Sequence, residues 1–124
     1  MELKQVDFLA IQHHFVDFQK KSHCFEMPTE NAYVLGIVEG GALIGYFIVA
    51  EYEDGTLEIQ QGYLKPVAQH RKLSYEAMNI LHAQAKKAGF TKVILKASRS
   101  LNAYTRFMRN LGYKPESIIF SRSI

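Results

Sequence analysis

Three consecutive strand-like segments separated by tight-turn signals constrain the fold of this chain most strongly. The segments cover residues 33–39, 42–52 and 56–64 and are rich in β-branched and aromatic residues. Gly40 and Gly41 form a two-residue hairpin signal between the first two, and Glu53-Asp54-Gly55 marks the second turn. We therefore predict that these residues form an antiparallel three-stranded meander.

The hydrophobic pattern changes from strand-like to helical spacing after the meander. An amphipathic helix is predicted over residues 73–88, with Gly89 as its natural end. The residues on or near its apolar stripe are Leu73, Ala77, Ile80, Leu81, Gln84 and Ala88. His82 lies off this stripe and is expected to face solvent.

Shorter elements flank the meander and the helix. They are predicted as a strand at residues 3–6, a helix starting after Asp7, a strand at 91–97, a helix at 102–111 and a strand at 117–121. The order β-α-β-β-β-α-β-α-β indicates an α/β protein whose central mixed sheet carries helices on both faces. Residues 1–124 are expected to form one domain. Residues 118–121 are expected at a sheet edge, where they could pair two subunits of a homodimer.

The net charge of +3 conceals a division between the two halves of the chain. Residues 1–64 carry three lysines against ten acids, a net −7, whereas residues 65–124 carry twelve Lys and Arg against two acids, a net +10. The basic half suggests an anionic partner, either nucleic acid or a multiply phosphorylated small molecule. Solvated lysines on helix faces explain the same charge equally well. The aromatic residues of this half fit helix and core positions better than an exposed stacking platform, so a nucleic-acid partner is not expected.

Several classes of protein are disfavoured by the composition. No apolar run approaches the roughly 20 residues of a membrane helix, so no membrane partner is expected. The N-terminus lacks a secretion-signal pattern, and the lone Cys24 cannot form an internal disulfide, which fits the reducing cytoplasm. His13 and His14 are adjacent on a predicted helix and point about 100° apart, so no metal site is expected.

The order of these elements, together with two short phrases, resembles the GNAT (Gcn5-related N-acetyltransferase) superfamily. The phrases are KKAGFTKVIL at residues 86–95 and RFMRNLGYK at residues 106–114, and the likeness covers roughly residues 33–113. The resemblance implies a GNAT-like fold and transfer of an acetyl or other acyl group from acetyl-CoA to an amine of a small molecule or protein. It implies acetyl-CoA as co-substrate and no metal.

The family binds the CoA pyrophosphate through a Gln/Arg-x-x-Gly-x-Gly/Ala turn at the start of a helix, where backbone N–H groups face the anion. The matching residues are Gln69, His70, Arg71, Lys72, Leu73 and Ser74. Lys72 replaces the first glycine, which would cost on the order of 1 kcal/mol if the position requires a positive φ. Arg71 and Lys72 also bring cations, so both a modified pyrophosphate site and a solvated basic turn remain open.

The resemblance also assigns the preceding strand end and the general base. A backbone N–H within Tyr63, Leu64 and Lys65 would polarise the thioester carbonyl. Glu58 lies eleven residues before Gln69 and matches the position of the family's glutamate base. Strand alternation is expected to place Glu58, Gln60, Gly62 and Leu64 on one face. A solvent-facing glutamate is the alternative interpretation of Glu58.

The general acid and the contacts to the rest of CoA fall in the predicted helix at 102–111. Met108 occupies the position of the family's proton-donating tyrosine and cannot donate a proton. Tyr104, one turn earlier, is the local substitute, with a packing role as the alternative. The resemblance also implies CoA contacts from Phe107 and from Asn102, which lies one residue from the family's asparagine that contacts the pantetheine arm.

Two functions from different classes are consistent with this pattern. The first is an N-acetyltransferase in which the acidic half attracts a cationic amine and the basic half holds the CoA phosphates. The second is a non-catalytic GNAT-fold binding or structural protein, similar to compact members found in phages and mobile elements. The second interpretation rests on the glycine-free turn, on Met108 and on the short chain, and the acetyltransferase is the function we predict.

Overall fold

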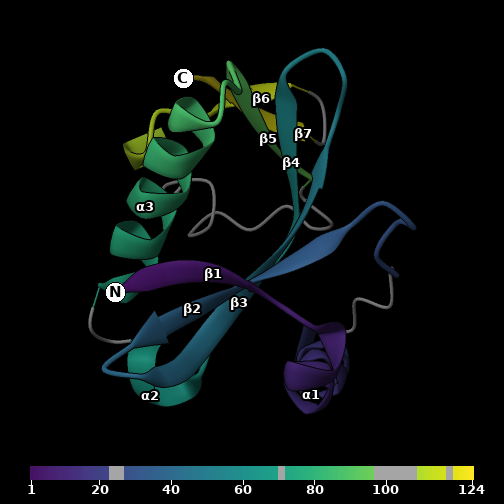
Figure 1. The fold of residues 1–124 in the computed structure, drawn as a ribbon, viewed down its shortest axis with the longest axis vertical. Helices are drawn as coiled ribbons and strands as arrows, with labels where there is room; N and C mark the ends of the chain where they lie inside the picture. The colour runs from purple at the N-terminus through teal and green to yellow at the C-terminus, as the bar shows by residue number, and fades with distance from the viewer. Residues whose placement is uncertain (23–26, 70–71, 97–108, 117–118) are drawn as a thin grey trace.

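The computed structural model describes residues 1–22, 27–69, 72–96, 109–116 and 119–124. Within them, seven strands form a single sheet in the order β1-β2-β3-β4-β5-β7-β6 (Figure 1). The strands are β1 (Glu2–Val6), β2 (Tyr33–Glu39), β3 (Ala42–Glu51), β4 (Thr56–Leu64), β5 (Lys92–Lys96), β6 (Lys114–Glu116) and β7 (Ile119–Ser123). Neighbouring strands pair antiparallel except for β4 and β5, which are parallel. The prediction of an α/β protein with a mixed sheet is confirmed.

The β2–β3–β4 meander forms where the sequence predicts it. Glu39 pairs with Ala42, which leaves Gly40 and Gly41 as a two-residue loop. Their φ values of +58° and +80° are both positive, as a type I′ hairpin turn requires. This turn matches the right-handed twist of the flanking strands and sets the register of the first hairpin.

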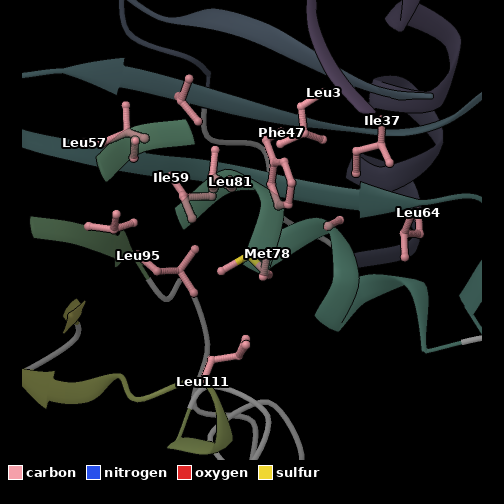
Figure 2. Packing of buried hydrophobic residues seen from close by; sticks show 14 of the residues in the cluster. Leu3, Ile37, Phe47, Leu57, Ile59, Leu64, Met78, Leu81, Leu95 and Leu111 are labelled. Atoms are coloured by element: carbon pink, nitrogen blue, oxygen red, sulfur yellow. The ribbon is translucent and has the colours of Figure 1, made fainter. Parts of the chain in front are cut away.

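Helices cover both faces of the sheet, as predicted. On one face, α3 (Leu73–Lys87) packs against β1–β5 and forms the larger hydrophobic core, shown in Figure 2. The side chains labelled there are Leu3, Ile37, Phe47, Leu57, Ile59, Leu64, Met78, Leu81, Leu95 and Leu111. On the other face, Ile11, which precedes α1 (Gln12–Ser22), and Phe15 within α1 pack on Val34, Tyr46 and Ile48.

The first helix begins later than the sequence predicts. Asp7 precedes a short 3-10 helix (Phe8–Ala10), and its side chain makes no capping hydrogen bond with the described residues. Ile11 then adopts φ −118°, outside the helical range, so α1 starts only at Gln12. Phe8 and Phe15 still meet edge to face, with ring centroids 5.2 Å apart.

The C-terminal strands correct the predicted sheet edge. β7 lies between β5 and β6, so the prediction of an edge strand at residues 118–121 is wrong. The edge is β6, which the sequence did not predict because Lys114, Pro115 and Glu116 carry no strand pattern. Proline is tolerated at such an edge because it has no N–H to donate. No helix within the described residues is long and apolar enough to cross a membrane.

His82 is buried, so the prediction that it faces solvent is wrong. Its side chain is 6% exposed and lies between α3 and the C-terminal strands. Arg122 Nη1 lies 2.6 Å from His82 Nδ1, and Tyr113 Oη lies 2.5 Å from His82 Nε2. Because arginine can only donate, Nδ1 must accept, and the Nε2–H donates to the tyrosine. β7 and Tyr113 cover a side of α3 that the apolar stripe did not identify.

This arrangement predicts acid sensitivity of the fold. Burial and the nearby Arg122 lower the pKa of His82 from 6.5 to about 4. Protonation therefore favours the unfolded chain, so the free energy of unfolding is highest above pH 6.5 and falls as the pH drops from 6.5 to 4. The expected loss from this group is about 3 kcal/mol.

Urea denaturation of the protein and of His82→Gln across this pH range measures the effect. The variant lacks the titrating ring, so its free energy of unfolding should vary less with pH even if it is less stable at neutral pH. Equal pH dependence in both proteins would contradict the prediction.

Candidate functional site

The candidate site lies where the pairing of β4 with β5 ends. Residues 56–59 of β4 pair with residues 92–95 of β5, and this four-residue pairing is here called the β4–β5 seam. On the other side of β4, Val49 of β3 pairs with Ile59 and Ile48 pairs with Gln61, so Gln60 is an extra, bulged residue. In Figure 1, β5 accompanies only one end of β4, whose remainder continues beside β3. Bulges of this kind redirect side chains and often lie next to functional sites.

The bulge changes which β4 side chains share a face. Leu64 belongs to the core beneath α3, whereas Tyr63 packs against the core beneath α1. Glu58 and Gln60 hydrogen-bond to each other and line a pocket with Ile48, on the α1 side. The prediction that Glu58, Gln60, Gly62 and Leu64 share one face is therefore wrong, because the inserted Gln60 shifts the alternation by one residue.

Glu58 is a buried carboxylate held by neighbours. It is 5% exposed, which makes the solvent-facing interpretation wrong. Gln60 Nε2 donates to Glu58 Oε1 at 2.8 Å. Burial, followed by the nearby Glu58 carboxylate, raises the pKa of Tyr52. The carboxylate is therefore fixed in position before any substrate arrives.

Gln60 connects Glu58 to the loop that precedes β2. Its Nε2 donates to Thr29 Oγ1 at 2.8 Å, and its Oε1 accepts from the Thr29 backbone N–H at 3.1 Å. The pocket beside these groups has a volume of about 60 Å³. Its lining residues are Met27, Pro28, Thr29, Ile48, Glu58, Gln60 and Gln61. A carboxylate in such a pocket can accept a proton from a bound amine.

The end of β4 carries the stretch expected to polarise a carbonyl. The Lys65 N–H donates to Ile44 O of β3 at 2.8 Å, so it is used within the sheet. Because successive N–H groups of a strand alternate in direction, the Leu64 N–H points away from β3, toward the β5 side. Gly45 of β3 pairs with Leu64 at this point and brings the two backbones close together.

The basic turn is shorter than the six-residue motif suggests. Gln69 ends the short helix α2 (Pro66–Gln69), and Leu73 and Ser74 already belong to α3. Lys72, between the helices, has φ +55° and ψ +19° and is the only non-glycine residue in the described part of the chain with a positive φ. It is exposed, and its side chain makes no capping hydrogen bond there.

The remaining sequence-predicted site residues lie outside the described residues. They are His70, Arg71, Asn102, Tyr104 and Phe107. One contact locates the residues that follow the last three: Asn110 Nδ2 donates to the Tyr75 hydroxyl at 3.2 Å. Tyr75 is in the first turn of α3, so Asn110 lies close to the start of that helix.

An aromatic group beside the end of β4 was not identified from the sequence. The His14 ring of α1 stacks on Tyr63 with centroids 5.7 Å apart, and Tyr63 lies 5.4 Å from Tyr46. Burial, followed by the charges of His13 and Lys65, lowers the pKa of His14. Only the spacing of the aromatic residues on β3 and β4 could have indicated this group. No cluster of three His, Cys, Asp or Glu side chains suited to a metal occurs among the described residues.

The chain belongs to the GNAT family of acetyltransferases. The sequence model of the family, described as acetyltransferase (GNAT) family, matches residues 2–113. A search of curated protein sequences finds no match.

Solved structures share the fold at low sequence identity. The ribosomal-protein-S18-alanine N-acetyltransferase from Escherichia coli is 14% identical with a TM-score of 0.77, covering 98% of this chain and 92% of that chain. The IAA acetyltransferase from Bacillus cereus is 12% identical with a TM-score of 0.77, covering 98% of each chain. A GNAT family acetyltransferase from Elizabethkingia anophelis with acetyl-CoA bound is 10% identical with a TM-score of 0.67, covering 90% and 82%. At these identities the likeness establishes the fold alone.

Proposed function

We propose that the protein is an N-acetyltransferase that uses acetyl-CoA to acetylate an amine. In this proposal the basic turn before α3 holds the pyrophosphate of CoA. The left-handed backbone of Lys72 is the observation that carries the proposal. Such a conformation costs a lysine on the order of 1 kcal/mol and persists only where the surroundings impose it, commonly at ligand-binding turns. At Lys72 the turn adopts a left-handed backbone that glycine enters at lower cost, which supports a pyrophosphate site in the place where the family has a glycine.

The residues of this turn are suited to a pyrophosphate. The first N–H groups of α3 have no partner inside the helix, and Lys72 does not cap them. The helix dipole makes this end positive, and the exposed Lys72 adds a cation. Lys72 and Ser74, with the sequence-predicted His70 and Arg71, would hold the phosphates. The acetyl-CoA bound to the Elizabethkingia relative supports this choice of co-substrate.

The reaction then requires two proton transfers beside the thioester: the amine loses a proton, and the leaving thiolate gains one. Bound acetyl-CoA supplies an activated acetyl group whose C–S bond breaks as the amine nitrogen forms the new C–N bond. Glu58 takes the proton that the amine loses, either directly or through a water molecule. Tyr104 is the proposed donor of a proton to the leaving thiolate. A reducing compartment such as the cytoplasm is consistent with the single Cys24.

Titration calorimetry with acetyl-CoA tests the proposal, using three variants at one position. Lys72→Ala removes the cation and keeps the left-handed strain, Lys72→Gly removes both, and Lys72→Arg keeps both. We expect the natural protein and Lys72→Arg to bind with similar affinity, and Lys72→Ala to bind about tenfold more weakly. Lys72→Gly should bind more tightly than Lys72→Ala.

Two results would contradict the proposal. Absence of acetyl-CoA binding by the natural protein would remove the co-substrate. Binding by Lys72→Gly alone would indicate a site that has lost its function, and would favour a non-catalytic role such as that of a structural component.

A further inference from the structure

The pocket beside Glu58 limits the size of the amine that can reach the carboxylate. Its volume is about 60 Å³, less than half of the roughly 150 Å³ of an apolar cavity known to hold a benzene ring. A pocket of this size suits an amino group and a few methylene carbons better than a ring. Ile48, which is 1% exposed, closes its inner side, and the exposed Met27 forms part of its rim.

The polar groups of the pocket favour a cationic group over neutral polar groups such as hydroxyls. Glu58 is the only ionisable side chain among the described lining residues. Both amide hydrogens of Gln60 are already used, one by Glu58 and one by Thr29. Gln61 Nε2 donates to the Tyr46 hydroxyl. A substrate rich in hydroxyl groups would find few partners here, whereas an ammonium group would pair with the carboxylate.

The other walls suit methylene groups. Met27, Pro28 and Ile48 present apolar surface on the path to Glu58. An unbranched alkyl chain can lie against these side chains while its terminal nitrogen reaches the carboxylate. The net charge of −7 in residues 1–64, the half that supplies the whole pocket, attracts such a cation over a longer distance.

We infer that the acceptor is a primary amine at the end of an unbranched alkyl chain, as in a free diamine or the side chain of a lysine. This inference rests on the proposed acetyltransferase function. Glu58 binds the ammonium group and then removes its proton, and the small volume of the pocket lined by Met27 and Ile48 disfavours branched and aromatic amines.

The test compares amines by the release of the CoA thiol from acetyl-CoA. Butylamine, butane-1,4-diamine and a lysine peptide with a blocked N-terminus are the straight-chain arms, and isobutylamine and benzylamine are the excluded ones. We expect kcat/KM to be at least about tenfold higher for the straight-chain amines. Preference for the diamine or for the peptide then distinguishes a free amine from a protein lysine.

Variants of Met27 connect the selectivity to this pocket. Met27 is 69% exposed, so Met27→Ala widens the rim without removing core packing. It should reduce the preference for butylamine over isobutylamine by about fivefold or more, whereas Met27→Leu should keep it. Leu9→Ala, which removes an exposed apolar side chain elsewhere, should also leave it unchanged.

The outcomes separate this inference from the proposed function. Equal or faster transfer to benzylamine or isobutylamine would overturn the inference and leave the acetyltransferase proposal intact. An unchanged preference in Met27→Ala would overturn the assignment to this pocket. Binding of acetyl-CoA without transfer to any of the amines would overturn both.

Discussion

Replacing Glu58 with glutamine is expected to lower kcat for acetyl transfer by about 100- to 1,000-fold and to leave acetyl-CoA affinity unchanged. Glutamine keeps the size of the side chain and an oxygen that can accept from Gln60 Nε2, so this hydrogen bond survives. It cannot accept the proton of the amine. The basic turn that is proposed to hold CoA lies elsewhere and is unaffected by the change.

Kinetics with a straight-chain amine and calorimetry with acetyl-CoA separate these two effects. Glu53→Gln is the matched control, because it removes an exposed acid from the β3–β4 turn and should change kcat less than twofold. If Glu58→Gln retained more than half of the natural kcat, the carboxylate would not be the base. A loss of acetyl-CoA affinity in this variant would instead indicate a structural role.

Replacing Gly45 with alanine is expected to destabilise the fold by about 2–4 kcal/mol. A Cβ atom at this position would lie 2.2 Å from the Tyr63 carbonyl oxygen and 3.1 Å from Leu64 Cα. Both neighbours are backbone atoms, so the end of β4 must move away from β3. That end leads through α2 into the basic turn proposed to hold the pyrophosphate, and acetyl-CoA affinity should therefore fall together with stability.

Urea denaturation of Gly45→Ala and Gly62→Ala tests the prediction within one pair of strands. At Gly62 the nearest atoms to an added Cβ are ring carbons of Phe47 at 3.3 Å, and a side chain can adjust more easily than a backbone. We expect Gly62→Ala to cost about 1 kcal/mol or less. If the two variants were equally stable, the close approach at Gly45 would have no energetic importance.

The elements that the sequence predicted well are those determined by local patterns. Gly40 and Gly41 specify a turn whose backbone few other residues adopt, and the alternation beside them identifies β2 and β3. The stripe from Leu73 to Ala88 likewise identified α3 before any contact was known, although Met78 and Ala85 are buried in place of Gln84 and Ala88. Glu58 was singled out because the family resemblance matches its position to a glutamate base, and its catalytic role stays a prediction.

The features that were missed depend on contacts between distant parts of the chain. Gln60 differs in no obvious way from its neighbours in sequence, and its bulge appears only when β4 is placed beside β3. His82 lies off the apolar stripe, and its burial depends on Tyr113 and Arg122, more than thirty residues away. The sequence could not predict the positive φ of Lys72, because lysine disfavours this conformation. It could predict only the energetic cost if the position required it.

The β4–β5 seam also affects the order in which the chain can fold. The strands of the meander are joined by turns of a few residues, so they meet at a small cost in chain entropy. The two sides of the seam are separated by the whole of α2 and α3, and parallel strands cannot pair until such a connection has crossed the sheet. The seam therefore belongs to the late contacts of folding. A growing chain would complete the pocket around Glu58 early. The β4–β5 seam beside it would form only after α3 has formed.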